Sequence, residues 1–128
     1  MYKRQIEDSI DTNTKSSFNK VSINKNGKEA KSILKPLKEL DCSSLIEIEI
    51  LTGRTHQIRA QCEKINNNIA NDKKYGCKDF NNRLKHSGIK RLGLHSSEIS
   101  FLDLDNKINT FVADYDDQFE KMLSYLNT

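Results

Sequence analysis

The clearest hydrophobic pattern lies at residues 44–51, SLIEIEIL, in which three isoleucines alternate with two glutamates. A period of two residues is typical of a β-strand with one buried face and one solvated face. Upstream, residues 21–23 and 30–37 also predict strands, and Asn26-Gly27 between them indicates a turn. Because Pro36 cannot donate a backbone hydrogen bond, we expect the second of these strands to lie at a sheet edge or to contain a bulge.

The pattern changes after Thr52-Gly53 from a period of two residues to a helical interval. This predicts a helix with Thr55 as its N-cap and a stop at residues 66–68. Gly53 at the junction indicates a backbone turn with positive φ, or a close approach to another group. The residues that define the helical interval are Ile58, Cys62, Ile65 and Ile69.

The C-terminal part of the chain predicts two more strands, near residues 98–101 and 108–112, joined by a turn at Asp105-Asn106. An amphipathic helix is expected over residues 114–127. Residues 1–20 show weak periodicity and are predicted to be an irregular lead-in to one unit spanning residues 21–128. The whole pattern predicts an α+β fold with a mixed, largely antiparallel sheet and a few packed helices.

Composition and charge add a strong asymmetry to this picture. The chain has 128 residues, enough for one domain or part of one, with a net charge of only +3. Residues 73–91 carry seven Lys or Arg against one Asp, whereas the chain from Asp103 onward is acidic. A local basic surface can engage phosphates, although a solvated loop explains the same charges. No apolar run is long enough for a membrane span or a signal peptide, so we expect no membrane partner and a cytoplasmic location.

The three cysteines, Cys42, Cys62 and Cys77, form no CxxC pair and are predicted to be reduced thiols. Two of them could be combined with His86 and His95 as metal ligands. The spacing of these four residues matches no compact zinc pattern, so we predict no metal ion.

The candidate chemistry lies at TGRTHQIR, residues 52–59. Arg54, just before the predicted helix, carries a planar group that suits a phosphate or a carboxylate, and the N–H groups of a helix N-terminus also favour an anion. Arg59 lies three positions after His56 and therefore on nearly the same helix face. A surface helix with ordinary solvated arginines accounts for these residues equally well on physical grounds alone.

The run LTGRTHQIR resembles the signature of the RluA-type RNA pseudouridine synthases. The resemblance continues in the family's order on both sides of this run. The further matching segments are GKEAKSILKPL (27–37), IANDKKYG (69–76), RLGLHSSEISF (91–101) and FVADYDDQF (111–119). Several ordered matches are far more specific than one short motif, and they imply that the chain is the C-terminal part of a pseudouridine synthase catalytic domain.

This resemblance implies an isomerase that converts uridine to pseudouridine in structured RNA, ribosomal or transfer, without a cofactor. An aspartate attacks the nucleotide, and Arg59 would be its ion-pair partner, with Ile58 in the apolar wall of the base pocket. The target base is expected to leave its stack to reach the site. The residues expected to support the junction or to face RNA are Arg54, His56, Gln57, Lys73, Lys74, Lys78, Arg83, Lys85, Lys90 and Arg91.

Three other residues match the family pattern without an assigned chemical part. Asp72 and Tyr75 match family positions, and for them a local turn or packing role is as consistent with the sequence as a catalytic one. His95 is expected to be a packed histidine bonded to nearby backbone. Asn71 stands where the family has glycine.

The family's catalytic aspartate belongs to an Arg-Leu-Asp-x-x-Thr-Ser-Gly motif upstream of the GRTHQIR run, and no such motif occurs here. We therefore expect this chain to be inactive alone, and its fold to show an unpaired strand edge and an exposed apolar patch. Two alternatives stay open: a non-catalytic RNA-binding module, and an α+β domain whose basic residues are merely solvated. The sequence does not predict an oligomeric state.

Overall fold

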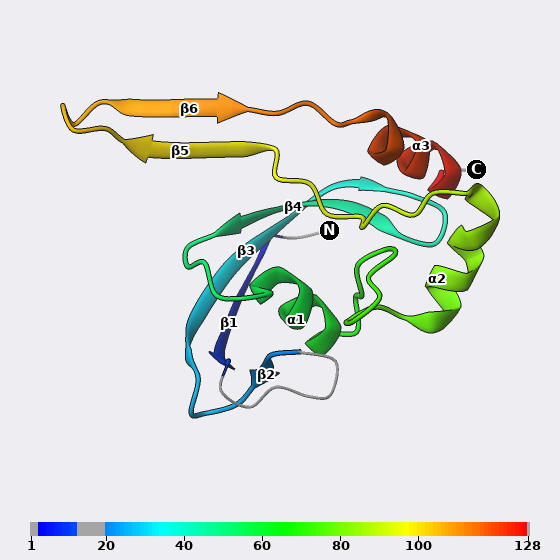
Figure 1. Ribbon diagram of the computed structural model, residues 1–128, viewed down its shortest axis with the longest axis horizontal. Helices are drawn as coiled ribbons and strands as arrows, with labels where there is room; N and C mark the ends of the chain where they lie inside the picture. Colours follow the sequence, from blue (N-terminus) through cyan, green and yellow to red (C-terminus); the bar gives the residue numbers. More distant parts are fainter. Residues whose placement is uncertain (1–2, 13–19, 128) are drawn as a thin grey trace.

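The computed structural model describes residues 3–12 and 20–127. Within them, a four-stranded antiparallel sheet has the order β2-β1-β3-β4, and a two-stranded hairpin, β5–β6, stands apart from it (Figure 1). The prediction of an α+β fold with a largely antiparallel sheet is confirmed. The elements are β1 (Arg4–Asp11), β2 (Ser22–Ile23), β3 (Lys28–Glu39), β4 (Ser44–Ile50), α1 (Gln57–Lys64), α2 (Lys78–Leu84), the 3-10 helix η1 (Lys85–Ser87), β5 (Glu98–Leu102), β6 (Ile108–Val112) and α3 (Asp117–Leu126).

Strand β1 corrects the prediction of an irregular lead-in, because residues 4–11 lie in the interior of the sheet between β2 and β3. Ile6, Asp8 and Ile10 alternate on the buried side of this strand. The central member is an aspartate, which disguises the alternation in the sequence. It is tolerated there because Lys64 pairs with its carboxylate and Gln61 donates to it, at 3.2 Å. The rest of the predicted lead-in, residues 13–19, lies outside the described residues.

Strand β3 is long and carries the irregularity expected at its proline. Its register with β4 shifts between Pro36 and Lys38, which confirms the predicted bulge, whereas the strand itself lies between β1 and β4 rather than at an edge. The turn expected at Asn26-Gly27 lies between β2 and β3, but these two strands do not pair with each other. Strand β2 pairs with one edge of β1, placing Ile23 opposite Ile10, and β3 pairs with the other edge of β1.

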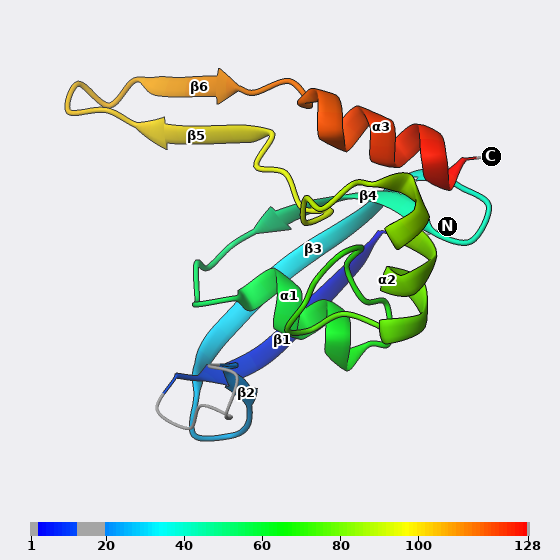
Figure 2. The ribbon, with the colours of Figure 1, turned by 45° about the vertical axis from the view of Figure 1, so that its right-hand side comes forward.

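Helix α1 begins later than the sequence predicted. His56 occupies the N-cap position with φ of 52° and makes no side-chain cap, so Thr55 is not the cap. The helix ends at Lys64, just before the predicted stop. Gly53 has no positive φ, so that expectation is wrong. A Cβ built on it would meet no protein atom within 4 Å, so only a close approach by another molecule stays a prediction. Helix α1 lies across one face of the sheet (Figures 1 and 2).

The basic stretch at residues 73–91, expected to be a loop, contains α2 and η1. The predicted hairpin and terminal helix are confirmed as β5, β6 and α3. Asp116 caps α3 by accepting a hydrogen bond from the Phe119 N–H at 2.8 Å. Helices α2 and α3 lie side by side, and the Tyr125 hydroxyl donates to the Arg83 carbonyl at 3.1 Å (Figure 2).

Two clusters of buried apolar residues hold these elements together. The sheet cluster lies between the sheet and α1, and the helix cluster lies between α2 and α3. The loop after α1 contributes Tyr75 to the first cluster, and it packs Ala70 against the second. The sheet cluster consists of Ile10, Val21, Ala30, Ala60 and Tyr75, and the helix cluster of Leu84, Ile89 and Met122.

An unpaired edge and exposed apolar side chains, both predicted for a partial domain, are present in the described residues. Strand β4 has a neighbour on one side only, and Leu37, Ile50 and Leu51 near this edge are about half exposed. The β5–β6 hairpin exposes a further set of large apolar residues. Among the described helices, none is both long and apolar enough to cross a membrane.

Candidate active site

The junction between β4 and α1 is organised by Gln57, whose side chain is almost fully buried. Its carbonyl oxygen accepts hydrogen bonds from the Thr52 hydroxyl at 2.7 Å and from the Arg54 N–H at 3.0 Å. Its amide nitrogen donates to the Lys31 carbonyl and to the Ser32 hydroxyl, both at 2.9 Å. The first two bonds close the turn, and the last two hold it against β3. Gln57 therefore supports the junction, and a contact of this residue with RNA stays a prediction.

One turn into α1, Arg59 forms a two-pronged ion pair with Asp72. The Nε and Nη2 atoms of the guanidinium donate to the two carboxylate oxygens, each at 2.7 Å. The Asp72 side chain is inaccessible to solvent, and the Arg59 side chain is 19% exposed. A parallel pair of charge-assisted bonds fixes both the position and the plane of the guanidinium. Among the described residues, Nη1 of Arg59 makes no hydrogen bond.

Asp72 is itself held by the loop that carries it. Its Oδ1 also accepts from the backbone N–H groups of Lys74 and Tyr75, each at 3.0 Å. Burial raises the pKa of this carboxyl, but the bonds from Arg59 and from the two N–H groups outweigh burial and lower it below its usual range. The hydrogen bonds to Asp72, with its negative charge, in turn raise the pKa of Arg59. Both groups are therefore charged at neutral pH.

Tyr75 connects this ion pair to His56. The phenol is buried, and the Arg59 guanidinium lies 5.0 Å from the centre of its ring. The hydroxyl oxygen accepts from the Val21 N–H at 2.8 Å and lies 2.8 Å from Nδ1 of His56. The hydroxyl and Nδ1 of His56 thus form a hydrogen bond whose direction is set by the tautomer of His56.

The local sequence explains why the loop after α1 can bring Asp72 to this point. Asn71, in place of the family's glycine, adopts φ of 57°, which asparagine tolerates better than most residues. Its side-chain amide also donates to the carbonyls of Ile89 and Arg91, at 2.9 and 3.1 Å. Gly76 is required by space, because a Cβ there would lie 2.0 Å from the Asp72 carbonyl oxygen.

The two other predicted residues of the GRTHQIR run lie near the surface. Arg54 is half-buried, and its Nε donates to the Glu29 carbonyl at 2.7 Å, so part of its donor capacity is used within the protein. Ile58 is also half-buried, on α1 beside Arg59. Its expected place in a base-pocket wall stays a prediction.

The basic residues divide into two groups. Arg91 is committed to the fold: it donates to Asp116 at 2.8 Å and to the Leu92 carbonyl at 2.7 Å, and it lies 3.0 Å from Nδ1 of His95. These bonds use much of the guanidinium internally, and its expected place on an RNA-facing surface stays a prediction. His95 lies 2.9 Å from the Ala113 carbonyl, as expected for a packed histidine. The exposed group consists of Lys73, Lys74, Lys78, Arg83, Lys85 and Lys90.

The cysteines are free thiols, and they differ in exposure. Cys62 on α1 is buried, and burial, with a smaller contribution from Asp72, raises its pKa to about 11. Such a thiol stays protonated and unreactive at neutral pH. Across the part of the chain that the structure describes, no group of three or more His, Cys, Asp or Glu residues could hold a metal ion.

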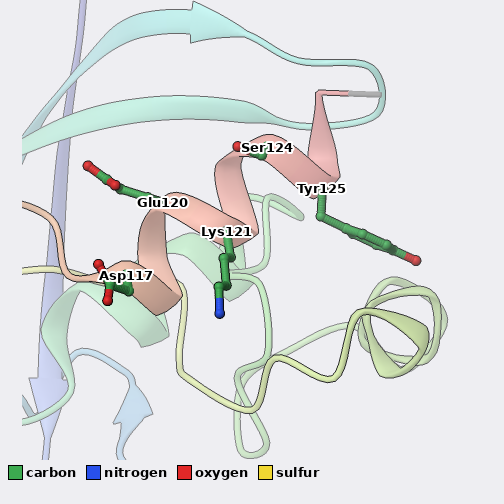
Figure 3. A pocket seen from close by; sticks show the side chains of 5 residues that line it. All are labelled: Asp117, Glu120, Lys121, Ser124 and Tyr125. Carbon is green, nitrogen blue, oxygen red and sulfur yellow. The ribbon is translucent and has the colours of Figure 1, made fainter.

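A shallow hollow elsewhere on the surface includes none of the predicted site residues. It is lined only by α3, through Asp117, Glu120, Lys121, Ser124 and Tyr125 (Figure 3). These side chains project outward from the solvated side of one helix and do not converge on a common point. The arrangement that gathers residues from distant parts of the sequence is instead the one around Arg59.

Sequence reasoning missed the partner that Arg59 has in this chain. Asp72 lies thirteen positions downstream, beyond the end of α1, and no periodicity relates the two residues. The available signal was the pairing of a matched aspartate with a glycine four residues later, which is typical of a tight loop. The prediction that Arg59 meets an aspartate outside this chain stays a prediction.

Comparison with known proteins identifies the class of protein to which this sheet and the Arg59–Asp72 site belong. Residues 2–64, which include β1 to β4 and α1, match the family model described as RNA pseudouridylate synthase. The chain belongs to the RluA-type RNA pseudouridine synthase family.

Individual relatives carry this match through the rest of the chain. Ribosomal large subunit pseudouridine synthase C of Buchnera aphidicola subsp. Schizaphis graminum is 36% identical over 98% of this chain and 40% of its own length. The protein of the same name from Vibrio vulnificus is 32% identical over 84% of this chain and 35% of its own length. An uncharacterized RNA pseudouridine synthase of Helicobacter pylori strain J99 is 42% identical over 70% of this chain and 33% of its own length. The chain thus spans less than half the length of these relatives.

Proposed function

We propose that this chain is the C-terminal part of the catalytic domain of an RNA pseudouridine synthase, which converts uridine to pseudouridine in ribosomal or transfer RNA. The observation that carries the proposal is the fixed guanidinium of Arg59 at the GRTHQIR turn, within the segment that the family model matches. The relatives named for the ribosomal large subunit favour ribosomal RNA as the substrate.

The geometry supports two separate uses of the donors of Arg59. Asp72 occupies Nε and Nη2, so the arginine is oriented before any partner arrives. Its Nη1 remains to meet a second carboxylate, the aspartate nucleophile that the family resemblance implies. A guanidinium held in this way would orient that carboxylate and favour its ionised form, which a nucleophile needs. Ile58, on the same helix, would then contribute to the wall against the uracil.

RNA would be bound by the exposed basic residues around α2 and the loop before it. Lys73 and Lys74 directly follow Asp72, which places two cations next to the ion pair. Phosphate contacts from flexible lysines supply affinity without sequence information. Arg54 would add a contact through the donors that its bond to Glu29 leaves available. Gln57 and Arg91 are left out of this proposed surface because their side chains are bonded within the protein.

A restored catalytic domain tests the proposal. The part of the Schizaphis graminum relative that precedes its match to this chain would be fused to the N-terminus of this chain, and tritium release from 5-tritiated uridine in ribosomal RNA would be measured. The fusion is expected to release tritium, whereas the present chain alone releases none. Arg59→Gln should reduce release on the order of a hundredfold or more, because it misplaces the nucleophile. Lys121→Gln on α3 is the control and should leave release unchanged.

A folded fusion that binds RNA but releases no tritium would contradict the enzyme. It would favour the second candidate, a non-catalytic RNA-binding module, which the names of the relatives do not favour. Release by this chain alone would contradict the need for an external aspartate.

A further inference from the structure

The β5–β6 hairpin extends away from the rest of the molecule and lies on the β4 side of the four-stranded sheet in both views (Figures 1 and 2). Its large apolar side chains are between 48% and 75% exposed, an unusual degree for a strand pair. These residues are Ile99, Phe101, Leu102, Ile108, Phe111 and Val112.

The exposure affects both faces of the hairpin. The register pairs Ile99 with Phe111, so these two residues share one face with Phe101, and the two phenyl rings stack 5.9 Å apart. The opposite face is mixed: Leu102 pairs with Ile108 at one end and Val112 with Glu98 at the other, with the Ser100–Thr110 pair between them. A hairpin that rests on its own protein has one apolar face covered. This hairpin instead exposes apolar side chains on both faces, and most of them on the face of the two phenyl rings.

Physical chemistry makes such a ribbon incomplete by itself. A two-stranded sheet is marginally stable in water, and three strands or a packed partner are needed for independent stability. Apolar surface gains about 25 cal/mol for each Å² removed from water, so covering six large side chains supplies a strong driving force. The outer backbone edges of β5 and β6, and that of β4, have no strand neighbour among the described residues.

The charges around the hairpin indicate what covers it. Glu98, Asp103, Asp105 and Asp114 surround the apolar residues, with Lys107 as the basic exception. An acidic rim repels phosphates, so exposed phenyl rings here do not suit the stacking of RNA bases. A polypeptide that supplies apolar side chains and strand edges suits both features.

We propose that the hairpin and the free edge of β4 form one docking surface, and that its occupant is the remaining part of a pseudouridine synthase catalytic domain, which can associate with this chain as a separate polypeptide. The relatives supply the reason for this occupant, because this chain covers only 40% of the length of the Schizaphis graminum protein. The proposal rests on the proposed function, and it adds that the two parts of the catalytic domain need no covalent link to associate.

The test is co-expression of this chain with the preceding part of the Schizaphis graminum relative as a separate polypeptide. Mass determination of the purified product and the dissociation constant are measured without RNA. We expect a one-to-one complex. Phe111→Lys should weaken it on the order of tenfold or more, as expected for one buried aromatic anchor. Gln118→Lys, which adds the same charge at an exposed position of α3, is the control and should leave the complex unchanged.

Phe111 is 60% exposed in this chain, so its replacement should leave the four-stranded sheet folded, and amide exchange of β1 and β3 checks this. Absence of a complex, or a complex that Phe111→Lys does not weaken, overturns the proposal. The proposal is also overturned if no two-piece complex forms and Phe111→Lys instead abolishes self-association of this chain or its binding to RNA. A complex that forms but releases no tritium from RNA leaves the docking surface standing and counts against the proposed function alone.

Discussion

Arg59 and Asp72 are joined by two hydrogen bonds of 2.7 Å that fix the plane of the guanidinium within this chain. The arginine expected to hold a catalytic carboxylate therefore has a structural carboxylate of its own. This arrangement separates two tasks that a single ion pair would have to combine. Asp72 positions the arginine and leaves Nη1 for the second carboxylate that we propose.

Asp72→Asn should destabilise the chain by about 3 kcal/mol, because breaking a buried ion pair leaves Arg59 without its compensating charge. Urea unfolding followed by circular dichroism measures the change. Asp79→Asn on α2 is the control, because Asp79 is exposed, and it should alter stability by less than about 0.5 kcal/mol. Equal effects of the two substitutions would mean that the pair contributes nothing specific.

The pH dependence of stability should carry the signature of Asp72. Its folded pKa is lowered, so the stability that it contributes is fully present above its unfolded pKa of about 3.9, and is lost as the pH falls through the folded value. The difference in unfolding free energy between the wild type and Asp72→Asn should therefore be constant from pH 7 to about pH 5 and shrink below about pH 4. A constant difference down to pH 2.5 would contradict this assignment.

Two glycines offer a matched pair of alanine substitutions. In Gly76→Ala the new Cβ would lie 2.0 Å from the Asp72 carbonyl oxygen, so the loop must move, and a loss of about 2 kcal/mol is expected. In Gly53→Ala nothing lies within 4 Å and φ is not positive, so stability should stay the same or rise by up to about 1 kcal/mol. Thermal unfolding of both variants measures these changes in stability. An unchanged stability of Gly76→Ala would show that the loop can accommodate the added methyl group.

The division of the basic residues predicts different effects on RNA binding. In the fusion protein, Lys73→Gln and Lys74→Gln should each reduce the slope of log K against log salt by about 0.7 to 0.9, the value of one phosphate contact. Arg91→Gln should leave this slope unchanged and instead lower stability, because its guanidinium is bonded to Asp116 and to backbone carbonyls. A slope that changes with Arg91 and not with the lysines would reverse the assignment.

The sequence predicts most elements of this fold because their patterns are local. The alternation over residues 44–51 and the amphipathic pattern of α3 needed no tertiary information. Strand β1 was missed because Asp8 occupies an inward position, and its charge is compensated only by Lys64 and Gln61 of α1. Burial of a polar residue through a distant partner is not visible in the hydrophobic pattern.

The site was predicted in part for the same reason. The GRTHQIR run identified Arg59 and the junction, because its residues are adjacent in sequence. It did not reveal which polar residues face inward. Gln57 is buried because β3 offers it a carbonyl and a hydroxyl, and Arg91 is bound because α3 begins with Asp116. Both partners come from other elements, which only the fold brings within reach.

The position of Asp72 between the two apolar clusters has a consequence for motion. Three residues after it, Tyr75 belongs to the sheet cluster, and two residues before it, Ala70 packs against the helix cluster. Small separate clusters open at different free energies, and each opening displaces its own end of the loop. We therefore expect the ion pair to depend on both anchors. Opening of the contact between α2 and α3 alone should loosen the hold of Asp72 on Arg59 while the sheet remains folded.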